Sequence, residues 1–515
     1  IAPGTAVTAL LGVAGAWVAV RAVYRAFCTP LRRVPGPLIC RFTNALVYYY
    51  VFRGKFHEFT TRLHAQYGEV VRIGYNQVSL ANPSELRRIL ATHNFRKSKV
   101  IERGIIMASS TFSTSDPAVN KQRRRQLGPA YSISALRALE DTVIEHGAQA
   151  LVRSWDRRIE QAQAAGAVAE VNYYYGFHGI AFDIIGVLGL GRSFGMAADG
   201  NTRIVDAVRQ HMKLVIMSGQ LSVVGQWRWL MPTHHAARDY VISVAKDAIA
   251  RRRSEMSDKG KPPSADILQK IIDAHDPETG ERLSGPSLTV EVMLTLIAGT
   301  DTTSNTLSFT MMHLLNHPTA LHRVQHDVRQ AFPDSAAWIR YDEAKVHVPF
   351  LTAVILESMR LHPAVNGYLP RATPAGGAVL LGTYALPADT IVTVSIGACH
   401  RNPGTWERPL EFDPERFMGA AGATRAKDVI AFSSGVRVCL GRNLAWVELY
   451  TTLANILRRY NFEIPADAPY GPHRCTTASA AASASQPEAI PSTSFVTFGP
   501  DDPCSNCRVR IAPAL

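Results

Sequence analysis

The residue best suited to chemistry is Cys439, at the centre of the stretch F-S-S-G-V-R-V-C-L-G at residues 432–441. A helix is predicted directly after this stretch, so backbone N–H groups and the positive end of the helix dipole are expected to lower the pKa of the thiol. Arg437 adds a fixed cation, and Gly435 and Gly441 let the backbone pass close to a flat, bulky group. A cysteine in such a loop is more often an inert core residue, so its chemistry depends on the rest of the chain.

A second group of polar residues lies inside a long apolar helix that we predict over residues 287–316, with its first residue, a serine, as N-cap. The segment A-G-T-D-T-T-S at residues 298–304 places hydroxyls, a glycine and a carboxylate in the middle of this helix. Thr302 can donate to the carbonyl four residues earlier and Gly299 weakens the helix, so a bulge or kink is expected there. Asp301 with a neighbouring hydroxyl could pass protons in such an opening.

A third motif is E-S-M-R, which places Glu357 and Arg360 three residues apart on one face of a predicted helix. On a surface this pair is worth under ~1 kcal/mol. Buried and joined by a further arginine, it becomes a rigid charged network that can hold a long loop. Arg416, in P-E-R-F between this helix and Cys439, is the expected third member.

Hydrophobic periodicity predicts a mainly α chain with small sheets near both ends. Further helices are predicted at residues 55–64, 83–91, 121–165, 183–191, 349–361 and 443–457, and strands at residues 70–74, 77–81, 378–381, 384–387 and 391–395. The Ser- and Ala-rich tract at residues 476–485 is predicted to be a loop.

Composition narrows the function classes. The net charge of +13 suits an anionic membrane surface or an acidic protein partner, and no basic-aromatic module points to nucleic acid. The seven cysteines are few, odd in number and scattered, which argues against a disulfide framework and for a reducing compartment.

The N-terminal segment is predicted to be a membrane anchor. Residues 6–20 are uncharged and nearly all apolar, and arginines follow them, which places the later chain on the cytosolic side. The expected organisation is a transmembrane signal-anchor at residues 1–28, a basic, proline-rich hinge and lead-in at residues 29–54, and one catalytic domain at residues 55–515. A buried N-terminal helix is the alternative.

Taken together and in this order, the motifs resemble those of the cytochrome P450 superfamily of haem-thiolate monooxygenases, in its microsomal, fungal type. These are A-G-x-D-T-T, E-x-x-R, P-E-R-F and F-x-x-G-x-R-x-C-x-G. The resemblance extends from P-G-P at residues 35–37 through H-R-N-P at residues 400–403 to the last strands. It implies a mainly α haem-thiolate fold with a small β region, preceded by an N-terminal membrane-anchor helix.

The resemblance also implies haem b as the cofactor, with Cys439 as the axial thiolate on the iron. Phe432 would pack against the haem beside the thiolate, and Gly435 and Gly441 would allow the loop to approach it. The residues expected to meet the haem propionates are Arg124, Arg371 and Arg437.

For the reaction itself, the resemblance implies that Asp301 and Thr302 are the acid–alcohol pair that delivers protons during oxygen activation. Glu357, Arg360 and Arg416 are then structural, holding the loop that carries the cysteine. The expected reaction converts R–H, O2, two electrons and two protons to R–OH and water.

No flavin-binding or ferredoxin-like segment is visible, so electrons are expected from a separate flavoprotein, NADPH–cytochrome P450 reductase, with cytochrome b5 as a candidate second donor. Its acidic face is expected to meet Lys121, Arg123, Arg125 and Arg442, although anionic membrane lipid competes for the same charge. The expected location is the endoplasmic reticulum membrane, single-pass, with the catalytic domain in the cytosol.

The substrate is expected to be a lipophilic small molecule of steroid, terpenoid, polyketide or fatty-acid type. Two alternatives stay open: a haem-thiolate isomerase or peroxygenase that needs no reductase, and a non-catalytic haem sensor. The stretches expected to line the substrate pocket are residues 101–112, 211–229, 293–302, 364–368 and 494–497.

Overall fold

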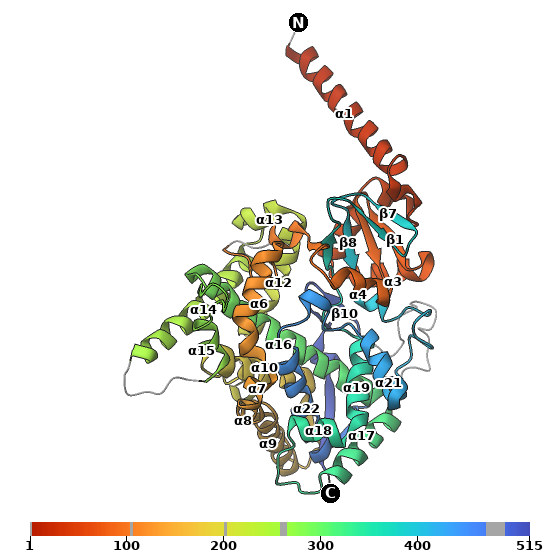
Figure 1. Ribbon diagram of the computed structural model, residues 1–515. Coiled ribbons are helices and arrows are strands. Elements are labelled where there is room, and N and C mark those ends of the chain that lie inside the picture. Colours follow the sequence, from red (N-terminus) through yellow and green to blue (C-terminus); the bar gives the residue numbers. More distant parts are fainter. Residues whose placement is uncertain (1–2, 104–106, 200–202, 258–264, 470–489, 515) are drawn as a thin grey trace.

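The computed structural model describes residues 3–103, 107–199, 203–257, 265–469 and 490–514. Helices form most of the body, and a smaller β region lies beside them near the base of the projecting helix α1 (Figure 1). The predicted fold class, mainly α with small sheets, is confirmed. The predicted loop at residues 476–485 lies outside the described residues.

The elements follow one another with short connections. The helices before the long central helix are α1 (Pro3–Phe27), α2 (Ala45–Phe52), α3 (Phe56–Tyr67), α4 (Pro83–Leu90), α5 (Lys99–Arg103), α6 (Pro117–Leu127), α7 (Ile133–Arg137), α8 (Glu140–Ile144), α9 (Ala150–Ala164), α10 (Tyr173–Leu190), α11 (Met196–Asp199), α12 (Arg203–Gln220), α13 (Ser222–Gln226), α14 (Pro232–Ser257) and α15 (Ile267–Ile272). The later helices are α16 (Gly285–Asn316), α17 (Pro318–Ala331), α18 (Tyr341–His347), α19 (Pro349–Leu361), α20 (Ile396–Cys399), α21 (Gly419–Arg425), α22 (Arg442–Arg459) and α23 (Pro503–Asn506).

The strands form four small sheets. They are β1 (Val70–Gly74), β2 (Gln77–Leu80), β3 (Arg96–Lys97), β4 (Ala169–Asn172), β5 (Pro370–Ala372), β6 (Ala378–Leu380), β7 (Tyr384–Leu386), β8 (Ile391–Val394), β9 (Tyr460–Glu463), β10 (Ser492–Ser494), β11 (Phe498–Pro500) and β12 (Arg508–Pro513). The largest sheet has the order β1-β2-β8-β5-β3, and the others are β4-β12-β9, β6-β7 and β10-β11. In the first sheet β3 and β5 are antiparallel, with Lys97 opposite Arg371.

The long helix α16 crosses the middle of the helical body (Figure 1) and packs against α10, α14, α19 and α22. Its N-cap is Ser284, whose side chain accepts from the N–H of Ser287, so the helix begins three residues earlier than predicted. The helix can begin before Pro286 because the first turn of a helix tolerates a proline. The helix ends where Pro318 follows, as predicted.

The predicted bulge in the middle of α16 is absent, because the helix runs without interruption from Gly285 to Asn316. Thr302 does donate to the carbonyl of Ala298, at 2.7 Å, but this bond adds to the helix without opening it. Gly299 has a packing role instead: a Cβ there would lie 2.5 Å from Cδ1 of Ile185 on α10. The glycine therefore allows α10 and α16 to pack closely.

Residues 121–165 form several elements and not one helix. Pro129 lies in a 3-10 turn, Gly128–Tyr131, that separates α6 from α7, and a π-helical turn, Glu145–Gln149, separates α8 from α9. The break at Pro129 separates α7 from α6, whose Arg124 reaches the cysteine loop, whereas the π-helical turn continues the helix from α8 into α9.

Helix α1 projects away from the body (Figure 1). None of the helices in the described part of the chain is long and apolar enough to cross a membrane, so the predicted transmembrane anchor at residues 1–28 is not confirmed. The apolar run is diluted by small residues such as Gly12 and Gly15, and Arg21 and Arg25 lie within the last turns of the helix.

Candidate functional site

The loop at residues 432–441 leads into α22 and folds back on itself, since the N–H of Cys439 donates to the carbonyl of Phe432 at 2.9 Å. Gly435 is needed here: its φ is +62°, and a Cβ would lie 2.2 Å from the carbonyl oxygen of Leu90 at the end of α4. Gly441 differs, because a Cβ there would meet no atom of the described chain within 4 Å. Its side therefore leaves room for a group to approach the backbone.

Cys439 is a free thiol whose side chain is exposed although protein surrounds the loop. Burial raises the pKa of this thiol, against the opposing effects of the N–H groups of Gly441 and Arg442 and the charge of Arg124. The N–H groups at the helix start do lower the pKa as predicted, but the surrounding protein outweighs them in the chain alone. A coordinating metal ion would supply the missing charge, since a bound thiol is deprotonated outright.

Four cations gather around this loop. Arg124 on α6 donates to the carbonyl of Val438 at 2.9 Å, and Arg437 donates to the carbonyls of Thr111 and Thr114 at 3.3 and 3.0 Å. Arg371 on β5 donates to the carbonyl of the residue before it. The three arginines predicted at the propionates are thus brought together with a fourth cation, Lys97.

Sequence reasoning missed Lys97. Its side chain is 5% exposed, donates to the carbonyl of Phe112 and lies over the ring of that residue. It becomes a neighbour of Arg371 only through the pairing of β3 with β5. The basic run R-K-S-K at residues 96–99 was the one available signal, and such runs usually belong to solvated surfaces.

The cluster Lys97, Arg124, Arg371 and Arg437 has little counter-charge within the described chain, where the charge of Glu102 acts on Arg437 without forming an ion pair. Among the described residues, none of the four forms an ion pair with a carboxylate. Burial, and then the charge of Arg437, lowers the pKa of Arg371 to about 10, and burial followed by Arg124 lowers that of Arg437 to about 10. Burial also lowers the pKa of Lys97 well below its usual value. Buried unpaired cations are costly, so the cluster fits a ligand carrying more than one negative charge.

On α16, Asp301 and Thr302 are half-buried, and the bond from the Thr302 hydroxyl to the Ala298 carbonyl is exposed. The two oxygens of Asp301 have different neighbours. Thr497, before β11, donates to Oδ2 at 2.6 Å, and Nε2 of His178 on α10 lies 3.6 Å from Oδ1. Burial raises the pKa of Asp301, but the neighbouring His178 and the bond from Thr497 bring it below its usual value.

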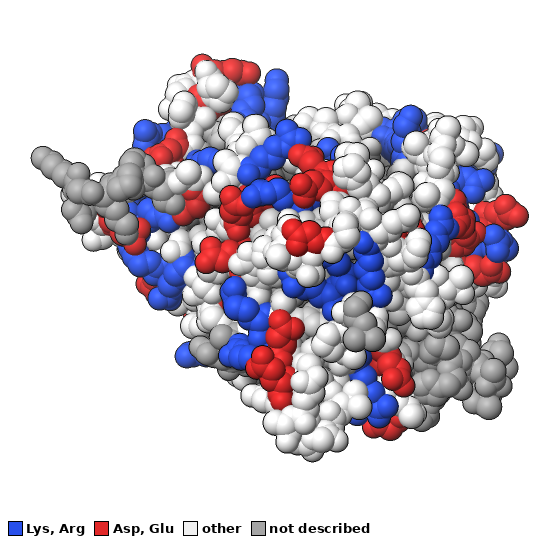
Figure 2. Space-filling model, turned by 90° about the horizontal axis from the view of Figure 1, so that it is seen from below, with Lys and Arg blue, Asp and Glu red and all other residues white. Residues whose placement is uncertain are grey.

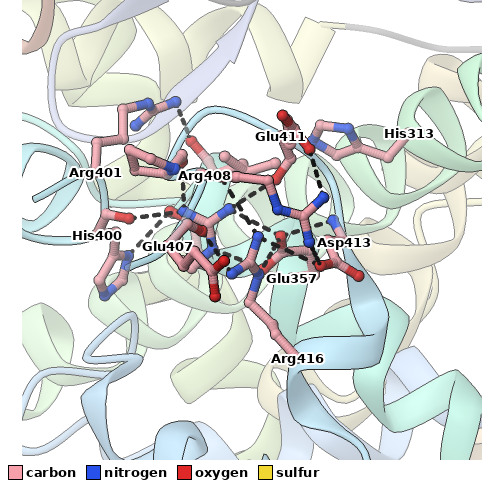
Figure 3. Close-up of polar contacts among 12 residues, drawn as sticks. His313, Glu357, His400, Arg401, Glu407, Arg408, Glu411, Asp413 and Arg416 are labelled. Atoms are coloured by element: carbon pink, nitrogen blue, oxygen red, sulfur yellow. Dashed lines mark hydrogen bonds and ion pairs between the residues drawn. The ribbon is translucent and has the colours of Figure 1, made fainter. Parts of the chain in front are cut away.

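Glu357 and Arg416, which are labelled in Figure 3, form one buried network with Arg360. Glu357 accepts from Nε and Nη2 of Arg360 at 2.6 and 2.8 Å, from Nε of Arg416 at 2.9 Å, and from the N–H of Asp413 at 2.9 Å. Glu357 and Arg360 are both fully buried. The three side chains predicted to form a network therefore do lie together.

The network reaches the cysteine loop through backbone groups and one histidine. Arg360 donates to the carbonyls of His400, Pro409 and Glu411 at 2.8, 2.7 and 2.9 Å, which fixes the chain before P-E-R-F (Figure 3). His400 also pairs through Nδ1 with the carbonyl of Arg360 and accepts from the N–H of Ile430 through Nε2, at 3.1 and 2.9 Å. Burial, and then Arg360, lowers the pKa of His400 to about 3, so it is neutral and can accept.

An apolar cavity lies beside this site. Four of the five stretches predicted to line the pocket contribute to it; residues 293–302 do not. Its lining residues are Val100, Ile101, Phe112, Val215, Ile216, Gly219, Val365, Tyr368, Leu369 and Val496.

The basic surface predicted for an electron donor is only partly available. Arg123 donates to Ser287 at 2.7 Å and pairs with Glu291, and Arg125 forms two hydrogen bonds to Asp276. These two arginines therefore connect α6 to its neighbours within the fold. Lys121 and Arg442 are exposed.

The thiol loop at a helix start, the cation cluster beside it and the acid–hydroxyl segment on α16 fit a haem bound through Cys439. The Cytochrome P450 family model matches residues 34–481, so the chain belongs to the cytochrome P450 family. The enzyme class predicted from the sequence, a cytochrome P450 monooxygenase, is thereby confirmed.

Similar proteins agree with this family. The chain is 31% identical over 494 residues to cytochrome P450 monooxygenase helB1 of Aspergillus fumigatus, covering 94% of this chain and 82% of the relative. It is 30% identical over 517 residues to cytochrome P450 monooxygenase helB3 of the same fungus, covering 98% and 99%. The crystal structure of the cytochrome P450DA heme domain superposes with a TM-score of 0.70 at 22% identity, covering 89% of this chain and 93% of that one, which shows the fold.

Proposed function

We propose that the protein hydroxylates a lipophilic small molecule at a haem held by the thiolate of Cys439, using O2 and electrons from a separate NADPH-dependent flavoprotein. One observation carries the proposal: the cluster Lys97, Arg124, Arg371 and Arg437 surrounds the thiol loop without a carboxylate partner. Haem b carries two propionates, so it would offset part of the charge of this cluster while the iron meets the sulfur.

The chain supports this cofactor at three further points. Gly441 leaves room beside the sulfur, and Gly435 holds the loop against α4. Phe432 packs at 6.1 Å from the ring of Trp446 on α22 and is placed to contact the haem beside the thiolate. When bound, the haem supplies the activation of O2 and the insertion of one oxygen atom into a C–H bond.

Asp301 and Thr302 would move protons in this reaction. The Thr302 hydroxyl is exposed and can turn from the Ala298 carbonyl toward a proton acceptor, and Asp301 is held by partners that keep it ionised. This arrangement favours a monooxygenase over an isomerase, a peroxygenase or a sensor, because those alternatives need no delivered protons.

The cavity supports the proposed substrate class, because its lining is apolar apart from the hydroxyl of Tyr368. That hydroxyl already donates to Gln77 at 3.0 Å, so little polar binding capacity is left. A steroid, terpenoid, polyketide or fatty-acid type of molecule matches such a lining.

For electron transfer, Lys121 and Arg442 would form part of the surface that meets an acidic reductase, with cytochrome b5 as a candidate second donor. Basic and acidic side chains are interspersed on the face in Figure 2, so on that face the net charge is not gathered into one area. We place the protein at the endoplasmic reticulum membrane with its catalytic body in the cytosol. The exposed apolar side chains of α1, including Trp17 and Val18, support contact with lipid.

Reconstitution tests the proposal. Spectral titration of the purified protein with a panel of lipophilic compounds selects those that bind, and each is then incubated with NADPH–cytochrome P450 reductase and NADPH. We expect a product heavier by one oxygen atom that requires NADPH, O2 and reductase together. Product formed equally with hydrogen peroxide and no reductase would favour a peroxygenase, and binding without any product would favour a sensor.

A further inference from the structure

His178 lies behind the predicted acid, on the neighbouring helix α10. Its side chain is 1% exposed, and its Nε2 is 3.6 Å from Oδ1 of Asp301, slightly beyond hydrogen-bond length. Among the described residues, this Nε2 has no hydrogen-bond partner. A buried imidazole nitrogen is rarely left without a partner, so the contact with the Asp301 carboxylate is the interaction that this nitrogen serves.

The other ring nitrogen determines which proton is present. Nδ1 lies 2.9 Å from the carbonyl oxygen of Tyr174, one turn earlier on α10. A carbonyl can only accept, so Nδ1 carries a hydrogen and donates. In the neutral ring Nε2 then carries a lone pair and no hydrogen, and this lone pair faces the lone pairs of the Asp301 carboxylate. Two acceptors at this distance attract each other only if a proton lies between them.

The charged and titratable groups around the pair are few. Tyr174 stacks on the His178 ring with a centroid distance of 3.9 Å, and its hydroxyl accepts from the exposed Arg209 on α12 at 2.8 Å. Arg209, with the exposed Asp206 beside it, lies on the solvent side of Tyr174. Thr497 occupies the other oxygen of Asp301, and within the described part of the chain the ion-pair contact of Oδ1 is with His178.

We propose that His178 is the proton store of Asp301, holding on Nε2 the proton that the carboxylate passes toward Thr302. The inference rests on the proposed function and adds a positioning residue to it. His178 does not reach the cofactor, and it acts through Asp301.

The step balances as a proton transfer alone. The imidazolium Nε2–H gives its proton to Oδ1, so a charged pair becomes a neutral imidazole and a carboxylic acid. Asp301 then releases the proton on the side of Thr302 and is again a carboxylate. A hydronium ion from solvent returns a proton to Nε2 by way of Asp301, which leaves water and restores the charged pair. No electrons move in either step.

The pair can be measured without turnover. We would label the histidine rings of the full-length holoprotein with carbon-13, reduce the haem and bind carbon monoxide so that the iron is diamagnetic, and follow each ring by NMR against pH. The variant His178→Gln identifies the His178 resonance by its loss. In Asp301→Asn we expect the titration midpoint of His178 to fall by about one pH unit or more, because an opposite charge this close favours the charged ring.

Glu291→Gln is the matched control, since Glu291 is a buried carboxylate on the same helix that contacts Thr111 and Arg123. It should leave the His178 midpoint unchanged. The proposal is overturned if Asp301→Asn moves the midpoint no further than Glu291→Gln does, or if the wild-type His178 ring remains neutral over the whole titration.

A second readout uses the compound hydroxylated in the reconstitution. His178→Gln should leave the carbon monoxide spectrum unchanged, raise the NADPH consumed per product several-fold and increase the solvent deuterium isotope effect on product formation. His235→Gln, which alters an equally buried histidine bonded to the Val224 carbonyl, should change neither quantity. Unchanged coupling in His178→Gln overturns the proposal. If the wild-type protein makes no product but its NMR titration behaves as expected, the proposed function is contradicted and the pairing of His178 with Asp301 is not.

Discussion

Replacing Glu357 with glutamine removes the negative charge from a site where no water can replace it. Glu357 is 0% exposed and accepts four hydrogen bonds, two from Arg360, one from Arg416 and one from the N–H of Asp413. Glutamine keeps one acceptor oxygen but replaces the other with an NH2 group. This NH2 group is a donor, and it faces a guanidinium that can also only donate. Two buried cations then lose their counter-charge.

Removing one partner of a buried ion pair costs about 3–5 kcal/mol, so we expect E357Q to lower the free energy of unfolding by about that amount. Urea unfolding followed by tryptophan fluorescence measures the loss, because Trp406 is buried with its ring 5.2 Å from the Arg360 guanidinium. We also expect the variant to lose haem more readily, since His400 connects Arg360 to Ile430 just before the cysteine loop.

The exposed ion pair of Arg408 with Glu411 provides the matched control. Its length is 2.8 Å, similar to the buried bonds, but its side chains are 55% and 59% exposed. E411Q makes the same chemical change and should cost less than about 1 kcal/mol. If E357Q costs no more than E411Q, burial of the network does not stabilise the fold in the way argued.

Three further outcomes are expected. Burial lowers the pKa of His57 and of His400 to about 3, so the stability that these residues contribute is complete above about pH 6.5 and is lost as pH falls. Together, His57 and His400 should lower the free energy of unfolding by about 4 kcal/mol between about pH 6.5 and 5, which is measured as a lower urea midpoint. An unchanged midpoint would show that these histidines are already charged in the folded protein. G435A should incorporate less haem, because its Cβ would collide with the carbonyl of Leu90, and a normal haem content would contradict the strained turn. K97M should release haem faster to an apo-myoglobin acceptor while circular dichroism stays unchanged, and an unaltered release rate would remove Lys97 from the propionate cluster.

The parts of the site that sequence could predict are those set by local spacing. Glu357 and Arg360 lie one turn apart on a single helix, so their pairing follows from helix geometry. The cysteine loop and the start of α22 are likewise adjacent along the chain. In each case the motif contains most of its own contacts.

The parts that failed depend on distant segments. Lys97 meets Arg371 only through strand register, and Gly299 is explained by Ile185, more than a hundred residues away in sequence. Arg123 and Arg125 looked like free surface cations until α16 and the loop at Asp276 supplied their partners. Propensity and motif spacing contain no information on such pairings.

The central claim is that Cys439 ligates haem iron, and the spectrum of the reduced, carbon monoxide-bound protein tests it most directly. The wild-type protein should show the long-wavelength Soret band of a thiolate-ligated iron. C439S should lose this band while circular dichroism remains that of the folded chain. A wild-type band at the shorter wavelength of histidine-ligated haem, or a long-wavelength band that persists in C439S, would contradict the account.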